Sequence, residues 1–197
     1  MARKHRVWYP GAMYHITARG NRRAAIFRIK HDYEMYLTLL QEVRNKYPFK
    51  LHAYCLMTNH LHLQIETISD HIQYIMKDLH SNYAIYFNKR LKIDGHVFQG
   101  RYGAQLIEDD AYFLEVSRYI HRNPLEAKMV KKLEEYPWSS YSAYIYNEAN
   151  PYIDKSKTYA YFPDPNHLYY QRFVESNVDV KDMNVKEDIT WEQLLQV

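Results

Sequence analysis

The best candidates for chemistry in this 197-residue chain are two histidines separated by a single leucine. His60 and His62 open a stretch that alternates polar and apolar residues up to Ile65, a pattern typical of a β-strand. Because side chains two residues apart point to the same face of a strand, both imidazoles would leave the sheet together and could grip one metal ion. In a chain with 11 histidines, however, so short a pattern is more often a pair that only forms hydrogen bonds.

A catalytic metal ion needs a third protein ligand, and Asn123 is a candidate. On a helix, residues four apart share one face, so the amide oxygen of Asn123 would lie beside the phenol of Tyr119. Tyr112 lies seven residues before Tyr119 on roughly the same face, and spacing alone does not exclude it. His121 lies about 160° around the helix from Asn123, so it is the weaker candidate for a ligand.

Hydrophobic periodicity predicts the elements that must position these residues. Strands are expected over residues 12–18, 51–57, 60–65 and 97–107, and helices over residues 32–47, 70–87 and 109–123. Thr58 and Asn59 would form the turn of a hairpin, and Pro124 should end the last helix. This βαββαβ order predicts an α+β fold: a ferredoxin-like antiparallel sheet with two helices on one face, and an extra C-terminal helix that carries Tyr119.

The net charge of +3 is unevenly distributed along the chain. Residues 1–146 carry 21 Lys and Arg against 14 Asp and Glu, whereas residues 147–197 carry 5 against 9. We therefore predict a basic domain over residues 1–146 and an acidic C-terminal extension over residues 147–197, with helices near 167–176 and 190–196. A basic body with 21 tyrosines fits a polyanionic partner, because tyrosine rings stack on bases; the alternative is a tyrosine-rich core.

Two short segments concentrate side chains that could hold a nucleic-acid backbone. The first is a basic turn at residues 19–23, the second follows Gly100, and a basic arm at residues 3–6 could add contacts. Guanidinium groups pair with phosphates and a tyrosine can stack on an unpaired base, although any one arginine is as often an ordinary surface charge. The candidate residues for binding a nucleic acid are Arg19, Asn21, Arg22, Arg23, Arg101 and Tyr102.

The composition excludes several other classes of protein. With only 5 glycines and 7 prolines the chain is neither collagen-like nor of low complexity. Its single cysteine, Cys55, excludes an intrachain disulfide and a multi-cysteine zinc site. No run approaches the roughly 18 apolar residues of a membrane span, and no secretory signal is visible. We therefore expect a cytoplasmic protein with no membrane partner.

In their joint order, these motifs resemble those of the REP-associated tyrosine transposases, within the HUH superfamily of single-tyrosine transposases. The resemblance extends from about Pro10 to Tyr144, and its main blocks are Tyr14–Thr17, Arg19–Arg23, Ala53–Leu63, Gly95–Tyr102, Tyr119–Pro124 and Tyr136–Tyr141. One departure is Thr58, where the family usually has proline. It affects the turn rather than the ligands.

The resemblance implies an enzyme that cleaves and rejoins single-stranded DNA, often with a hairpin as the recognised element, through a 5′-phosphotyrosine intermediate. By position, His60 and His62 match the catalytic histidine pair that binds the metal. Asn123 matches the residue that completes the metal site, and Tyr119 matches the nucleophile. Residues 1–146 would then be the catalytic domain. The implied cofactor is Mg²⁺ or Mn²⁺, of which Mn²⁺ is the better intrinsic match to two imidazoles.

The resemblance also implies a prokaryotic protein associated with the nucleoid, and it leaves open whether the chain acts as a monomer or as a homodimer. A non-catalytic module that binds a DNA hairpin or RNA is the main alternative, because a ferredoxin-like sheet with surface aromatics also describes RNA-binding domains. Such a module would bind its target without a metal. A metal hydrolase that activates water is a third hypothesis, and it would cleave without a covalent adduct.

Overall fold

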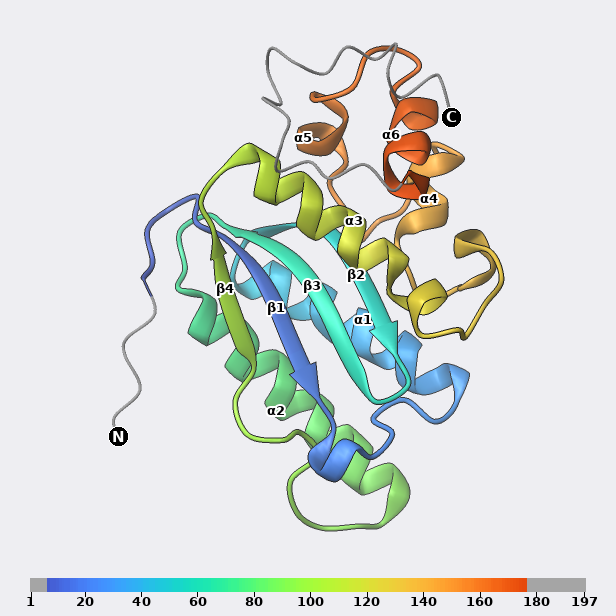
Figure 1. Cartoon of the computed structure of the whole chain (residues 1–197). Helices are drawn as coiled ribbons and strands as arrows, with labels where there is room; N and C mark the ends of the chain where they lie inside the picture. The colour runs from blue at the N-terminus through green and yellow to red at the C-terminus, as the bar shows by residue number, and fades with distance from the viewer. Residues whose placement is uncertain (1–6, 177–197) are drawn as a thin grey trace. The chain divides into compact units, whose positions relative to one another are not determined.

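The computed structural model describes residues 7–176, and the order of its main elements is the one predicted (Figure 1). The elements are β1 (Met13–Arg19), η1 (Asn21–Arg23), α1 (Lys30–Lys46), β2 (Phe49–Met57), β3 (His60–Thr67), α2 (Ile72–Leu91), β4 (Gly103–Ile107), α3 (Asp110–Glu126), η2 (Leu133–Glu135), α4 (Tyr141–Ile145), α5 (Ser156–Tyr159) and α6 (Asn166–Glu175). The four strands form an antiparallel sheet in the order β2-β3-β1-β4, which confirms the predicted ferredoxin-like fold. None of these helices is long and apolar enough to cross a membrane.

The chain divides into two compact units. The first unit ends at Leu106 and contains the described chain before it, except for His52–Cys55. Those four residues of β2 belong with the second unit, which otherwise begins at Ile107. The sequence-based boundary at residue 146 concerns the extent of a catalytic domain and stays a prediction. The arm at residues 3–6 and the helix at 190–196 lie outside the described residues.

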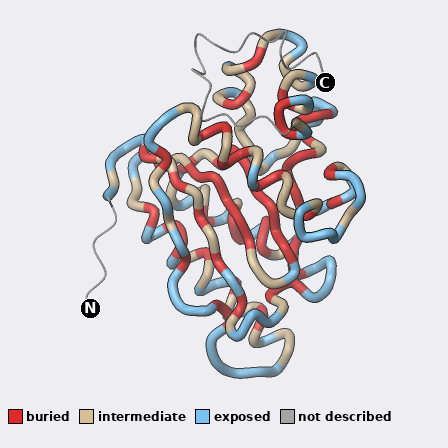
Figure 2. The backbone as a smooth tube through the Cα atoms, in the orientation of Figure 1, coloured by how far each residue is buried: buried red, intermediate tan, exposed pale blue. Residues whose placement is uncertain are grey.

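The pairing of β1 with β3 in the first unit separates apolar from polar side chains. Ile16 lies opposite Leu63, and both are fully buried. In the next row, whose side chains point to the other face of the sheet, Thr17 lies opposite His62. Helices α1 and α2 both lie on one face (Figure 1), and Figure 2 shows that burial follows the central strands. The apolar rows therefore pack beneath the helices, and the polar rows occupy the opposite face.

A buried carboxylate fixes the start of α1. Asp32, which is 0% exposed, accepts hydrogen bonds from the backbone N–H groups of Arg28 at 2.7 Å and Ile29 at 3.2 Å. Two side chains of α2 reach the same carboxylate: Arg90 Nη2 lies 2.8 Å away, and the Tyr86 hydroxyl donates at 3.0 Å. One negative charge thus connects α2 to the loop that leads from β1 into α1.

Tyrosines build much of the core of the second unit. The rings of Tyr144 in α4 and Tyr170 in α6 lie 4.6 Å apart between centroids, and neither ring is exposed. Both buried hydroxyls have partners: that of Tyr144 donates to the His52 carbonyl oxygen at 2.7 Å, and that of Tyr170 lies 2.5 Å from the Ser117 hydroxyl. The helix predicted near residues 167–176 is confirmed as α6.

Many tyrosines in the described chain therefore serve packing. The six bulkiest fully buried side chains are tyrosines, namely Tyr14, Tyr36, Tyr83, Tyr141, Tyr144 and Tyr170. Burial raises the pKa of the phenol in each of the last five, so these hydroxyls stay protonated and act within the fold. The high tyrosine content is thus explained in large part by a tyrosine-rich core.

Some predicted boundaries are wrong, among them those of the last strand and of α3. Of the strand expected over residues 97–107, only residues 103–107 form a strand, β4. The preceding segment makes one isolated β-bridge, between Phe98 and Gly20. Helix α3 continues beyond Asn123 to Glu126. A proline in the last turn removes only one N–H donor, and the turn is still closed by the bond from the Ala127 N–H to the Asn123 carbonyl oxygen at 2.9 Å.

We expect Asp32→Asn to lower the free energy of unfolding by about 3 kcal/mol, because it leaves Arg90 opposite a neutral amide in a largely buried setting. Urea unfolding followed by circular dichroism measures this change. Asp78→Asn is the matched control, since Asp78 pairs with Lys46 at 2.7 Å on the surface and should cost less than about 1 kcal/mol. Equal losses in the two variants would contradict the structural role given to Asp32.

Candidate active site

His60 and His62 project from β3 on the same face, as their spacing predicts. Their ring centroids lie 5.2 Å apart, with the two planes nearly perpendicular at 88°. His62 is buried, at 6% exposure, whereas His60 at the start of the strand is partly exposed. The pair therefore combines one sheltered and one accessible imidazole at the hairpin end of the sheet.

The tautomer of His60 is set by its neighbour in the hairpin turn. His60 Nδ1 lies 2.7 Å from Asn59 Oδ1, and a carbonyl oxygen can only accept, so Nδ1 carries the proton. The same amide donates through Nδ2 to the Arg23 carbonyl oxygen at 3.2 Å, which fixes its orientation. The lone pair of His60 is then on Nε2. This is how outer hydrogen bonds prepare an imidazole for a metal.

A third histidine, absent from the predicted site, joins the pair. His15 Nε2 of β1 lies 3.0 Å from His62 Nδ1, so one of the two rings donates and the other accepts. Burial lowers the pKa of His15 to about 4. Burial, helped by the nearby His15, His60 and Arg19, lowers the pKa of His62 to about 3. Both rings are therefore neutral at pH 7, and the neutral imidazole is the form that binds metals.

The donor set suits a metal ion that needs further ligands. Within residues 7–176, no group of three or more His, Cys, Asp and Glu side chains is arranged to hold a metal. His60 and His62 offer two imidazole donors on one face, and His15 is engaged with His62 through the ring nitrogen described above. An oxygen donor of another type, such as an amide, fits this partial set.

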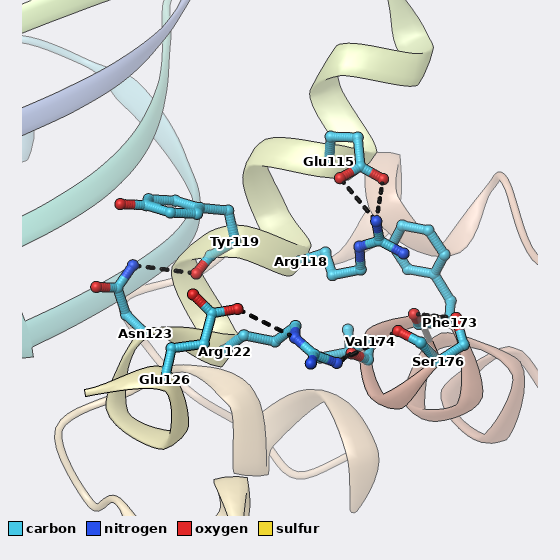
Figure 3. Close-up of polar contacts among 9 residues, drawn as sticks. All are labelled: Glu115, Arg118, Tyr119, Arg122, Asn123, Glu126, Phe173, Val174 and Ser176. Carbon is cyan, nitrogen blue, oxygen red and sulfur yellow. Dashed lines mark hydrogen bonds and ion pairs between the residues drawn. The ribbon is translucent and has the colours of Figure 1, made fainter. Parts of the chain in front are cut away.

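Tyr119 and Asn123 lie together on α3, in the second unit. Tyr119 is 45% exposed, and the Asn123 side-chain amide donates to the Tyr119 carbonyl oxygen at 3.1 Å. Figure 3 shows both side chains projecting from the same flank of the helix, as their spacing of four predicts. The structure thus brings together each predicted pair within its own unit. The convergence of the tyrosine with the histidine pair stays a prediction.

The two rival residues on α3 are less suitable. His121 is fully buried, and its ring nitrogens lie 2.7 Å from the Ser140 hydroxyl and 2.7 Å from the Tyr170 hydroxyl. It is a core residue rather than a ligand. For Tyr112, burial and the Asp109 carboxylate raise the pKa of the phenol, which makes it harder to deprotonate than an unshifted phenol.

Three segments of the first unit meet beside the histidine pair. The N–H of Gly20 donates to the Asn59 carbonyl oxygen, that of Asn21 to Val97, and that of Gln99 to Arg19, each at 2.8 Å. In the β1–β3 register, Arg19 lies directly opposite His60. The end of β1, the hairpin turn and the loop before β4 therefore form one basic surface next to His60.

The basic turn has an unusual backbone. Arg22 and Arg23 both lie in the left-handed region, with φ of 53° and 60°, and both are exposed. Gly20 is required by space rather than by φ, because a Cβ there would lie 2.0 Å from the Ala24 carbonyl oxygen. The turn thus points two adjacent guanidinium groups outward from a closely packed base.

Arg101 and Tyr102 occupy a different setting from the one expected. Tyr102 is only 8% exposed, and its ring lies edge-on to His80 at 6.1 Å between centroids. Both residues line a cavity of about 420 Å³ beside α2, together with Lys77 and Phe98. The buried ring of Tyr102 therefore offers little surface on which a base could stack, whereas Arg101 is exposed.

Of the functional contacts, sequence reasoning missed His15. Its place in the alternating segment of residues 12–18 predicts a polar-face position, but only the register of β1 against β3 places it near His62. For Asn59 the sequence predicts a place in the turn and no role toward His60. In both cases the sequence shows a residue that can form hydrogen bonds, but it does not show which histidine that residue contacts.

Comparison with known proteins places the chain in a family. The profile of IS200-like transposases matches residues 9–123, more than half of the chain. A REP-associated tyrosine transposase solved bound to a REP hairpin has a TM-score of 0.64 and 18% identity, covering 78% of this chain and 91% of that one. A protein described as a transposase from Deinococcus radiodurans has a TM-score of 0.41 and 13% identity, covering 68% and 97%. No curated protein matches.

At 18% identity, the first of these structures shows that the fold is shared. The match over residues 9–123 includes the histidine pair of β3 as well as Tyr119 and Asn123 of α3. By the extent of that match, the chain belongs to the family of IS200-like transposases.

Proposed function

We propose that this protein is a metal-dependent transposase that nicks and rejoins single-stranded DNA at hairpin-containing sites through a 5′-phosphotyrosine intermediate. Membership of the IS200-like family supports a role in DNA transposition. The structural relative bound to a REP hairpin supports hairpin DNA as the substrate. The observation that carries the proposal is the pair of imidazoles, His60 and His62, held on one face of β3, of which burial keeps His62 neutral.

In this proposal His60, His62 and Asn123 hold a divalent cation, Mg²⁺ or Mn²⁺. When bound, such an ion neutralises charge on the oxygens of the scissile phosphate. Asn59 keeps His60 in the tautomer that presents Nε2. Two imidazoles and one amide oxygen match Mn²⁺ more closely than Mg²⁺, which prefers oxygen ligands alone.

Tyr119 acts as the nucleophile. Its phenol loses a proton, and the phenolate oxygen attacks phosphorus in line with the bond to the 3′ oxygen. That bond breaks, the 3′ oxygen takes up a proton, and the DNA is left with a 3′-hydroxyl and a 5′ phosphate joined to Tyr119. The new ester conserves the energy of the phosphodiester. A 3′-hydroxyl from another DNA end can therefore reverse the attack and join a new strand.

In this proposal the basic surface beside His60 binds the DNA backbone. Arg19 lies next to the histidine pair, while Arg22 and Arg23 extend outward from the turn. Their guanidinium groups can pair with successive phosphates, and Asn21 and Arg101 add donors near the same end of the sheet. Phosphate contacts of this kind fix the strand's position without reading its sequence.

Tyr119→Phe removes the attacking oxygen and keeps the ring, so we expect loss of the covalent adduct by at least about a thousandfold with unchanged DNA affinity. The measurement is a denaturing gel of the protein with labelled hairpin DNA and Mn²⁺. Tyr112→Phe serves as the control and should form the adduct at the wild-type level. An adduct that persists in Tyr119→Phe and vanishes in Tyr112→Phe would reassign the nucleophile.

Removing the metal should stop cleavage and leave DNA binding in place. We expect EDTA to abolish nicking, excess Mn²⁺ to restore it, and His60→Ala to lower the cleavage rate by about a hundredfold. His31→Ala is the matched control, because His31 is an exposed surface residue that lies 3.8 Å from Glu34 and edge-on to the Tyr86 ring at 5.8 Å between centroids. Binding without any cleavage in the wild-type chain would favour the non-catalytic module, and cleavage without an adduct would favour a hydrolase.

A further inference from the structure

Helix α3 has a second flank, separate from the one that carries Tyr119, and α6 lies along it (Figure 3). Arg122 extends from this flank to the end of α6. Its Nη1 donates to the carbonyl oxygens of Val174 at 2.9 Å and Ser176 at 3.3 Å. The last carbonyls of a helix lack donors within the helix, so one guanidinium here caps α6 and fastens it to α3.

Arg118, one turn earlier on α3, makes a second attachment. Its guanidinium lies over the Phe173 ring at 5.2 Å from the centroid and pairs with Glu115 at 2.8 Å. Only 13% of the Arg118 side chain and 21% of the Arg122 side chain are exposed. Both arginines are therefore part of a sheltered contact between two helices, and neither is an ordinary surface charge.

Behind the arginines, a buried chain of hydrogen bonds runs between the same helices. The Tyr170 hydroxyl of α6 lies 2.5 Å from the Ser117 hydroxyl and 2.7 Å from His121 Nδ1, both on α3. His121 Nε2 lies 2.7 Å from the Ser140 hydroxyl. Because Ser117 and His121 both make these bonds, α3 cannot rotate about its axis without breaking them. Tyr119 lies midway between the two residues in the sequence, so its position depends on the same bonds.

We infer that Arg122 is a positioning residue for the reaction: by clamping α6 against α3 it fixes the direction in which Tyr119 projects. The inference rests on the proposed function, in which Tyr119 is the nucleophile. In-line attack on phosphorus depends steeply on the position of the attacking oxygen, and an error of 1 Å can cost about a hundredfold in rate. Arg122 lies within residues 9–123, whereas helix α6, which it holds, lies outside the segment that the family profile matches.

The test is a single-turnover measurement of adduct formation on saturating hairpin DNA with Mn²⁺. We expect Arg122→Gln to lower the rate constant by roughly tenfold while the final amount of adduct and the DNA affinity stay at the wild-type level. Arg122→Lys should recover most of the rate, because an ammonium group can donate to the same carbonyl oxygens. The matched control is Arg172→Gln on α6, whose guanidinium lies over Tyr169 at 5.9 Å, and it should react like the wild type.

A wild-type rate in Arg122→Gln would overturn the inference. So would a smaller final amount of adduct at an unchanged rate constant, because that is the signature of partly unfolded protein. If the wild-type chain forms no adduct at all, the proposed function itself fails. The position of Tyr119 can then still be followed by fluorine NMR of 3-fluorotyrosine placed at residue 119. A resonance altered in Arg122→Gln and unaltered in Arg172→Gln supports the clamp, and identical spectra in both overturn it.

Discussion

The register of β1 against β3 is the constraint on which the candidate site depends. Because side chains alternate between the faces of a strand, a slip of one residue would turn His60 and His62 into the apolar layer beneath α1 and α2. The buried pair of Ile16 and Leu63 opposes this, since the slip would move Leu63 out of the apolar layer and leave Ile16 without its partner. The same register brings His15 to His62. Packing of the apolar side chains on one face of the sheet thus determines which histidines lie together on the other face.

Burial and hydrogen bonding prepare the histidines in different ways. His62 is kept neutral mainly because its surroundings exclude water, whereas His60 is oriented by the amide of Asn59. The hairpin turn therefore both connects the two strands and orients the imidazole of His60. Thr58 contributes its carbonyl oxygen to the N–H groups of Ile26 and Phe27 at 2.9 and 3.0 Å. A proline, which the sequence resemblance leads us to expect at this position, would offer the same carbonyl oxygen.

Local periodicity was enough to predict the order of the strands and helices, and it placed His60 with His62 and Tyr119 with Asn123. It was not enough for contacts that depend on register, which is why His15 was missed. The sequence of an extended segment does not show whether that segment pairs with a strand, so the strand predicted over residues 97–107 is longer than β4. Composition did not separate core tyrosines from exposed ones: Tyr102 was expected to face DNA and is buried.

The backbone of the basic turn has a consequence for how its sequence can vary. A left-handed conformation costs an arginine roughly 1–2 kcal/mol relative to the right-handed one, and Arg22 and Arg23 adopt it in succession. Glycine or asparagine would relieve most of that strain. A chain selected for stability alone would drift toward those residues at both positions. The turn therefore places two guanidinium groups side by side in the sequence against the local preference of the main chain.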